Sequence, residues 1–228
     1  SLNFGSMMVH MGDVDTMVAG AENSTGNVLR SAFAIIGTAP GVKTASSCFV
    51  MGTPTKEYGA DGLILFADCA TIPDPTAEQL AEIAIASAQS CRDFLGIEPY
   101  VAMLSFSTKG SADHPDVDKV RTATELIKKM KPELKVDGEL QADAALVPSV
   151  GASKAPGSDV AGKANILVFP NLASGNIGYK LVQRIAKAQA YGPFLQGFAK
   201  PVSDLSRGCS IDDIINTSAV SLVQASNQ

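Results

Sequence analysis

Residues 62–105, GLILFADCATIPDPTAEQLAEIAIASAQSCRDFLGIEPYVAMLS, contain the pattern that decides the fold class. Gly62–Ala67 and Tyr100–Ser105 are continuous apolar runs of the length expected for strands that are buried on both faces. Between them, Thr76 and Gln79 have the spacing of a capping box, which marks the start of a helix. Side chains that share one face of that helix are Leu80, Ile83, Ala84, Ser87, Cys91 and Phe94. The stretch therefore predicts a strand, a helix and a second strand.

The same alternation extends over the rest of the chain. Further strands are expected at Ala45–Met51, Leu134–Val136, Ala164–Phe169 and Gly192–Phe198. Pro115 suits the first turn of another helix, and Ser174 can cap a third. That third helix carries Ile177, Leu181 and Ile185. A last helix is expected from about Ser210 to Gln224, whereas Pro148–Gly162 has the composition of a loop.

Alternating strands and helices predict an α/β fold with a mainly parallel sheet and helices on both of its faces. Ligands in such sheets bind beyond the carboxyl ends of the strands. This rule directs attention to the loops after Ser105 and Phe169 and to the segment around Ser206.

Composition excludes several classes of function. The 228-residue chain has a net charge of −5, so a broad nucleic-acid surface is not expected. It has four cysteines without a C-x-x-C pair and two histidines, which predicts buried reduced thiols and no metal site. No apolar run approaches the roughly 18 residues that a membrane span needs, and residues 1–5, SLNFG, do not resemble a signal peptide. We therefore expect no membrane contact and a cytoplasmic location.

Residues 157–164, GSDVAGKA, nearly match the P-loop pattern G-x-x-x-x-G-K-[ST]. The last position is Ala164, which has no hydroxyl group to hold Mg²⁺. The segment also precedes an expected strand, whereas a P-loop follows a strand and opens a helix. We therefore do not expect nucleotide hydrolysis.

Residues 204–214, DLSRGCSIDDI, allow two interpretations. In the first, Ser210 is the N-cap of the last helix and Asp213 completes an acidic capping box. In the second, Arg207 and the unpaired N–H groups of the helix N-terminus bind a phosphate group. Ser206 would then add a neutral donor, and Asp213 would place a carboxylate within reach of a thiol or hydroxyl group.

Two other polar clusters are open to similar alternatives. Ser24 and Thr25 lie at an expected helix start with Arg30 further along, which fits either an anion site or a simple cap with a solvated Arg. Ser105–Ser111, SFSTKGS, includes Ser107 and Thr108 and follows an expected strand. Such a loop binds an oxyanion or forms a polar turn.

Five segments together resemble phosphate acetyltransferases and phosphate butyryltransferases. They are LSRGCS at 205–210 followed by Asp213 and Ile214, LSFSTKGS at 104–111, DGELQ at 137–141, PNL at 170–172 with Gly175–Ile177, and FADC at 66–69 leading into Asp74–Thr76. The likeness covers nearly the whole chain and is therefore more specific than any one motif. GDVDTM at 12–17 is similar to the family's Gly-Asp-Ala-Asp-Gly-Met, with Val14 and Thr16 as substitutions.

The resemblance implies a two-domain α/β fold with the active site in the cleft between the domains, in a homodimer. The family's usual N-terminal segment is not recognised, so the first domain is expected to be incomplete and to begin with a strand near Met7–His10. Residues 1–38 would be the remainder of the first domain and residues 39–200 the second domain. Residues 201–228 would return to the first.

The resemblance also implies roles for individual residues. Asp213 would be the general base for the thiol of coenzyme A, Arg207 and Arg30 would hold acetyl phosphate, and Ser206 would donate to the transition-state oxygen. Further substrate-binding residues would be Ser24, Thr25, Ser107, Thr108, Asn171, Gly175 and Asn176. Coenzyme A and acetyl phosphate or inorganic phosphate are then the substrates, with neither a metal nor a separate cofactor.

Alternatives of other kinds remain. The acyl group could be butyryl, and similar domains fused to bacterial malic enzymes resemble acyl-CoA sensors rather than enzymes. A fragment that folds but lacks part of its site is a third alternative. Within the enzyme hypothesis, Cys209 competes as a nucleophile, since it lies at a helix N-terminus near Arg207.

Overall fold

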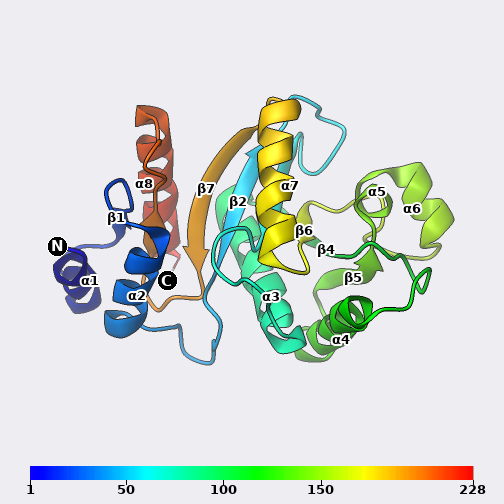
Figure 1. Cartoon of the computed structure of the whole chain (residues 1–228), viewed down its shortest axis with the longest axis horizontal. Coiled ribbons are helices and arrows are strands. Elements are labelled where there is room, and N and C mark those ends of the chain that lie inside the picture. Colours follow the sequence, from blue (N-terminus) through cyan, green and yellow to red (C-terminus); the bar gives the residue numbers. More distant parts are fainter. Residues whose placement is uncertain (228) are drawn as a thin grey trace.

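The structure, a computed structural model, describes residues 1–227 and consists of strands that alternate with helices (Figure 1). The strands are β1 (Met17–Ala19), β2 (Ser46–Gly52), β3 (Leu63–Ala67), β4 (Tyr100–Leu104), β5 (Lys135–Leu140), β6 (Ile166–Val168), β7 (Gln189–Gln196) and β8 (Val202–Asp204). The helices are α1 (Leu2–Met11), α2 (Thr25–Ile35), α3 (Ala77–Leu95), α4 (Pro115–Met130), α5 (Ala142–Leu146), α6 (Pro148–Lys154), α7 (Leu172–Ile185) and α8 (Ile211–Ser226).

All the strands of the described residues belong to one sheet, in the order β1-β8-β7-β2-β3-β6-β4-β5. Strand β2 pairs antiparallel with β3 and β7, and β7 pairs antiparallel with β8. The other neighbours are parallel. The α/β fold with a mainly parallel sheet is therefore confirmed.

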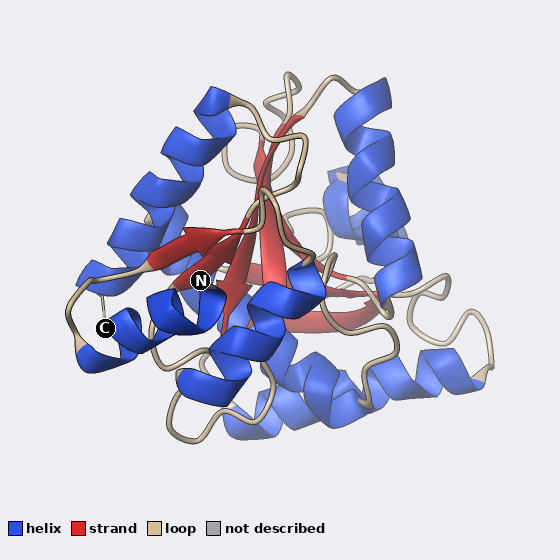
Figure 2. Ribbon diagram, turned by 60° about the vertical axis from the view of Figure 1, so that its left-hand side comes forward, coloured by secondary structure: helices blue, strands red, loops and turns tan. Residues whose placement is uncertain are grey.

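Helices cover both faces of this sheet (Figure 2). Successive strand residues point to opposite faces, so one strand supplies two cores. On β4, Val101 and Met103 join the core beneath α3 and α4, whereas Ala102 and Leu104 join the core beneath α5 and α7. This double burial explains why the strands read as continuous apolar runs in the sequence.

A third apolar cluster joins α1 and α2 to the sheet edge. Val9 of α1 and Val28 of α2 are buried with Leu195 of β7 and Val202 of β8. Burial of one such aliphatic side chain contributes about 1.5–3 kcal/mol to stability. The cluster therefore holds α2 on the same face of the sheet as α7, and this placement positions the candidate site.

Several local expectations are confirmed. Thr76 and Gln79 form a complete capping box at the start of α3, and Pro115 opens α4. Ser210 caps α8 as expected. The segment at 157–164 lies in turns that precede β6, as expected for a sequence that is not a P-loop.

Other local expectations are wrong. The strand expected near Met7–His10 is part of the helix α1, which ends at Gly12 in the left-handed conformation with φ of 80°. Pro148–Gly162 is not entirely a loop, because α6 occupies its first half. The cap of α7 is Asn171, whose side chain accepts a hydrogen bond from the backbone N–H of Ser174. The short strands β1 and β8 lie outside the expected strands.

The apolar stripe of α7 also differs from a core-facing stripe. Ile177, Leu181 and Ile185 are 59%, 52% and 77% exposed, respectively. The helix instead packs inward through Tyr179 and Val182. The stripe at i, i+4 and i+8 therefore faces away from the sheet.

The sheet continues across the boundaries expected at residues 38 and 200. Phe194 of β7 is paired with Ser203 of β8, and an isolated bridge joins Thr38 to Phe198. The division into residues 1–38, 39–200 and 201–228 stays a prediction. No helix within residues 1–227 is long and apolar enough to cross a membrane.

Candidate active site

A cleft opens beyond the carboxyl ends of the paired strands β1 and β8. These strands are parallel, with Ala19 opposite Asp204, so the turns that follow them lie side by side. One turn leads into α2 and the other into α8, and α7 forms the facing wall. The cleft has a volume of about 830 Å³. It lies at the kind of sheet edge where α/β proteins bind ligands.

The segment after β8 brings two of the expected catalytic residues to this cleft. Ser206 and Arg207 both line it and are exposed. The Ser206 hydroxyl oxygen accepts a hydrogen bond from the backbone N–H of Gly208 at 3.3 Å, which leaves its hydrogen available to a ligand. Arg207 makes no hydrogen bond or ion pair with any side chain among residues 1–227. Its guanidinium group is available for an anion.

Asp213 fits both interpretations of its sequence at the same time. Its Oδ2 accepts hydrogen bonds from the backbone N–H and the hydroxyl group of Ser210, at 2.8 Å and 2.9 Å. The backbone N–H of Asp213 in turn donates to Ser210, which completes the capping box of α8. The same carboxylate lines the cleft. Because both bonds to the cap use Oδ2, Oδ1 remains for a proton acceptor role.

The start of α2 forms another part of the wall. Ser24 caps the helix by accepting from the backbone N–H of Asn27 at 3.3 Å, and Thr25 is the first helical residue. Both residues line the cleft with Gly26. The unpaired N–H groups of this helix start add partial positive charge to the cleft.

Arg30 is not brought to the cleft wall. It is exposed on α2, and its Nη1 donates to the side-chain oxygen of Asn27 at 2.9 Å. The cleft receives other cations instead, Lys180 and Arg184 of α7. These two were missed by the sequence analysis, although Asn176, Lys180 and Arg184 recur every four residues and so share one face of a helix.

The three expected residues near the start of α7 have different positions. Asn171 caps the helix, and Gly175 packs against the segment that directly follows β3, where an added Cβ would overlap the carbonyl oxygen of Asp68. Only Asn176 lines the cleft. Its side chain donates to the carbonyl oxygen of Cys69 at 3.1 Å and accepts from Lys180 at 2.8 Å.

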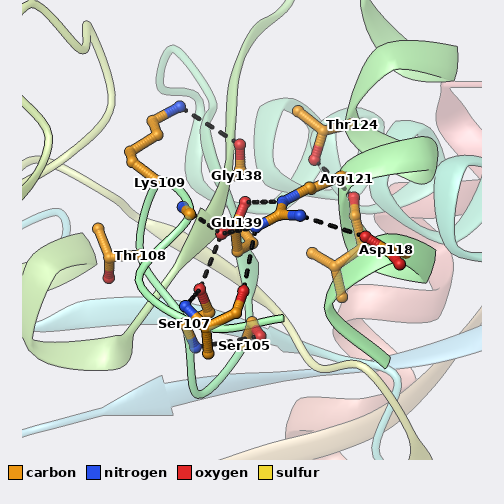
Figure 3. Close-up of polar contacts among 12 residues, drawn as sticks. Ser105, Ser107, Thr108, Lys109, Asp118, Arg121, Thr124, Gly138 and Glu139 are labelled. Carbon is orange, nitrogen blue, oxygen red and sulfur yellow. Dashed lines mark hydrogen bonds and ion pairs between the residues drawn. The ribbon is translucent and has the colours of Figure 1, made fainter. Parts of the chain in front are cut away.

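Ser107 and Thr108 lie in a different network, at the carboxyl ends of β4 and β5 (Figure 3). Both are buried. The Ser107 hydroxyl donates to Oε1 of Glu139 at 2.9 Å, and Nε of Arg121 donates to Oε2 at 3.0 Å. Thr108 accepts from the backbone N–H of Gln141 at 2.9 Å. The hydroxyl groups therefore tie the loop after β4 to β5, and their expected role in substrate binding stays a prediction.

Asp204 is a further residue at the cleft that sequence reasoning missed. It ends β8, is only 2% exposed and contacts the Thr25 hydroxyl. Cys209 also lines the cleft and has a free thiol. Within residues 1–227, no group of three His, Cys, Asp or Glu side chains is arranged to hold a metal ion.

Comparisons with known proteins point to one family. A family model described as phosphate acetyl/butaryl transferase matches residues 1–222. A phosphate acetyltransferase of Treponema pallidum is 58% identical over 100% of this chain and 68% of its own length. One from Clostridium acetobutylicum is also 58% identical, over 98% of this chain and 67% of its own length. The crystal structure of a phosphotransacetylase from Streptococcus pyogenes is 50% identical and superposes with a TM-score of 0.94, covering 99% of this chain and 67% of that one.

The Glu139 network gives a prediction about stability. Arg121→Ala should lower the free energy of unfolding by ~2–3 kcal/mol, because Glu139, whose side chain is 3% exposed, would lose its cation. Denaturant unfolding measures this loss. The control Lys128→Ala breaks an exposed pair with Glu125 and should cost less than about 0.5 kcal/mol. Equal losses in the two variants would contradict a structural role for the network.

The same network predicts acid sensitivity. Burial would raise the pKa of Glu139, but hydrogen bonds from Arg121, Gly110 and Ser107 outweigh burial and hold the pKa at about 2, below the ordinary 4.5. Because the pKa is lowered on folding, this stabilisation is complete above pH 4.5 and is lost as the pH falls towards 2. The stability difference between the unaltered protein and Glu139→Gln should therefore shrink over that interval in unfolding measurements. A difference that is constant with pH would refute the assignment.

Proposed function

This chain belongs to the phosphate acetyl/butaryl transferase family, and we propose that it moves an acetyl group between coenzyme A and inorganic phosphate. Relatives named phosphate acetyltransferase are 50–58% identical over nearly the whole chain, so the chain is an acyltransferase of this family. The observation that carries the reaction is the cleft that Ser206, Arg207 and Asp213 share. Formation of acetyl-CoA from acetyl phosphate and coenzyme A by the purified protein tests it.

In the proposed reaction the thiol of coenzyme A attacks acetyl phosphate directly. Oδ1 of Asp213 takes the thiol proton as the sulfur bonds to the acetyl carbon, and the bond from that carbon to the phosphate oxygen then breaks. A free thiol has a pKa of about 8.5 and is mostly protonated at neutral pH, so a base is needed. The half-buried position of Asp213 in the cleft supports this role.

The leaving phosphate and the developing oxyanion need positive partners. Arg207 supplies a guanidinium fork for the phosphate, which becomes a better leaving group when its charge is neutralised. In the proposed reaction the Ser206 hydroxyl donates to the oxyanion, a contact that contributes about 3–4 kcal/mol to transition-state binding in comparable sites. The N-terminus of α2 with Ser24 and Thr25 adds donors for phosphate oxygens. Protein groups alone supply the proposed chemistry, without a metal or cofactor.

Other proposed substrate-binding residues lie on or near α7 and α2. Asn176, Lys180 and Arg184 face the α2 and α8 starts from α7, where they suit the phosphates of coenzyme A. Arg30 would contact substrate only if it exchanges its bond to Asn27 for one to phosphate. Asn171 and Gly175 would act through the position of α7.

We also propose that the active form is a homodimer, with α7 at the interface. The family resemblance implies a dimer, and the exposed stripe of Ile177, Leu181 and Ile185 offers an apolar surface for a second copy. The stripe is on the helix that also lines the cleft, so pairing there would stabilise the cleft wall.

Arg207→Ala should lower kcat/KM by roughly 10²–10³-fold without lowering the melting temperature. An exposed Arg without partners among the described residues contributes little to folding, whereas a bidentate phosphate contact is hard to replace. Steady-state kinetics and thermal unfolding measure the two effects. Arg92→Ala, an exposed Arg on α3, is the control and should change neither. Loss of the fold in Arg207→Ala would show a structural role instead.

Asp213→Asn should lower kcat by roughly 10²–10⁴-fold, while Cys209→Ser keeps most of the activity. Asn retains an oxygen for the Ser210 cap but cannot accept the thiol proton. Cys209 has no histidine partner in the segment, and the substrate thiol makes a second nucleophile unnecessary. Both variants are compared by steady-state kinetics. A trapped acetyl group on Cys209 together with ping-pong kinetics would move the nucleophile onto the enzyme.

Leu181→Glu should convert the dimer to a monomer, because it places a charge in the apolar stripe of α7. Light scattering after size-exclusion chromatography measures the molar mass. Met130→Glu changes an apolar residue that is 54% exposed at the end of α4 and should leave the mass unchanged. A dimeric Leu181→Glu variant would place the interface elsewhere.

A further inference from the structure

Asp204 is a buried carboxyl group at the floor of the cleft that the proposed reaction does not use. It is the last residue of β8 and directly precedes Leu205 and Ser206. Its side chain lies against the first residue of α2, so it joins the two turns that form the cleft. A buried titratable group in a cleft is a candidate for a functional residue.

The hydrogen bonds of Asp204 are incomplete. Oδ2 lies 2.5 Å from Oγ1 of Thr25, and Oδ1 is buried without any hydrogen-bond partner among the described residues. Gly20 covers Oδ1: its φ is +111°, and an added Cβ would overlap this oxygen and the backbone of Leu205. The close approach of Gly20 keeps water from Oδ1. An ionised carboxylate would therefore have one hydrogen bond where it can accept several.

Among residues 1–227, no cation forms an ion pair with Asp204. The elements packed against β8 are β1, β7, α2 and α8, and their titratable side chains are Tyr191, Arg30, Asp212 and Asp213. Arg30 lies outside the cleft wall and is bound to Asn27. The cations that line the cleft, Lys180, Arg184 and Arg207, form no ion pair with Asp204. A buried carboxylate without a cation is costly, and protonation removes that cost. Consistent with this, burial raises the pKa of Asp204, and the bond with Thr25 offsets only part of the effect.

The protonation state of Asp204 decides what Thr25 can do. A hydroxyl group has one hydrogen to donate. If Asp204 is ionised, Thr25 must donate that hydrogen to Oδ2 and has none left for a ligand. If Asp204 is protonated, its own hydrogen occupies the bond to Oγ1, and the hydroxyl hydrogen of Thr25 becomes available to the cleft.

We propose that Asp204 is a positioning residue: it stays protonated and donates to Thr25, so that the Thr25 hydroxyl donates in turn to an oxygen of the phosphate substrate. Thr25 lines the cleft as the first residue of α2, where the backbone N–H groups also favour an anion. The chain of two hydrogen bonds thus adds a neutral donor to the phosphate site. This inference rests on the proposed function only in taking phosphate as the ligand.

Two measurements on the intact protein test the proposal. Titration calorimetry with inorganic phosphate should give a Kd roughly 10- to 100-fold higher for Thr25→Val than for the unaltered protein, and KM for phosphate should rise more than kcat falls. Thr25→Ala replaces the valine variant if that one does not fold. Ser203→Ala is the matched control: it removes a buried hydroxyl from the same strand, where Ser203 contacts Ser221, and should not change the Kd.

Asp204→Asn tests whether the hydrogen that residue 204 donates to Thr25 matters, because the amide group can donate but cannot ionise. Its amide nitrogen can donate to Thr25 as the protonated acid does, so phosphate affinity near neutral pH should stay close to that of the unaltered protein. The unaltered protein should lose affinity relative to this variant at alkaline pH, as Asp204 ionises. Comparison at each pH cancels the titration of phosphate itself. An infrared difference spectrum between the two proteins should show the carbonyl stretch of a protonated carboxyl group at neutral pH.

These measurements distinguish failure of this proposal from failure of the proposed function. Absence of the protonated carboxyl band, or equal phosphate affinity in Thr25→Val and the unaltered protein, would overturn the proposal. A protein that binds phosphate as described but does not exchange acetyl groups would refute the proposed function and support this inference, because calorimetry and infrared spectroscopy need no turnover.

Discussion

The parallel pairing of β1 with β8 is the constraint on which the site depends. It extends from Met17 opposite Val202 to Ala19 opposite Asp204, and a hydrogen bond from the backbone N–H of Leu205 to Ala19 continues it by one residue. Thr25 and Asp204 are 179 positions apart in the chain, yet this short ladder places them in contact. Because both strands end at the same edge, the helices that follow them start on the same cleft. Strands of this length are stable only with support, which the apolar cluster beneath α1 and α2 supplies.

The sequence predicts those parts of the fold that leave a recognisable pattern of residues. Strands buried on both faces leave continuous apolar runs, and the box of Thr76 and Gln79 leaves a recognisable start for α3. The ladder of β1 and β8 leaves no such pattern, because three residues are too few for a period. Met7–His10 has the composition of a strand, but in the structure it is part of the helix α1. Tertiary packing of Val9 in the apolar cluster stabilises the helix over the strand.

The sequence likewise predicts some residues of the candidate site and not others. Ser206, Arg207 and Asp213 lie in one segment with a helix start, so local reasoning and family likeness both lead to them. Lys180 and Arg184 follow a helical spacing that was visible, but which face of α7 meets the cleft is decided by its packing through Tyr179. For the same reason the apolar stripe of α7 could not be assigned to the core or the surface from its spacing. Asp204 gives no local signal, since Gly20 and Thr25, which meet its carboxyl group, lie far from it in the sequence.

Burial gives two carboxyl groups of one segment opposite properties. Asp204 lies beneath the cleft, shielded by Gly20 and without a cation, which favours its neutral acid form. Asp213 lies nine positions later in the first turn of α8, where it lines the cleft and its Oδ2 accepts a hydrogen bond from the backbone N–H of Ser210. An acid that stays neutral can donate a hydrogen bond, and a carboxylate that lines the cleft can accept a proton. In the proposed reaction these two residues of the same type therefore have different tasks. Asp204, which is 2% exposed, positions the Thr25 hydroxyl for the phosphate, and the half-buried Asp213 takes the proton of the thiol.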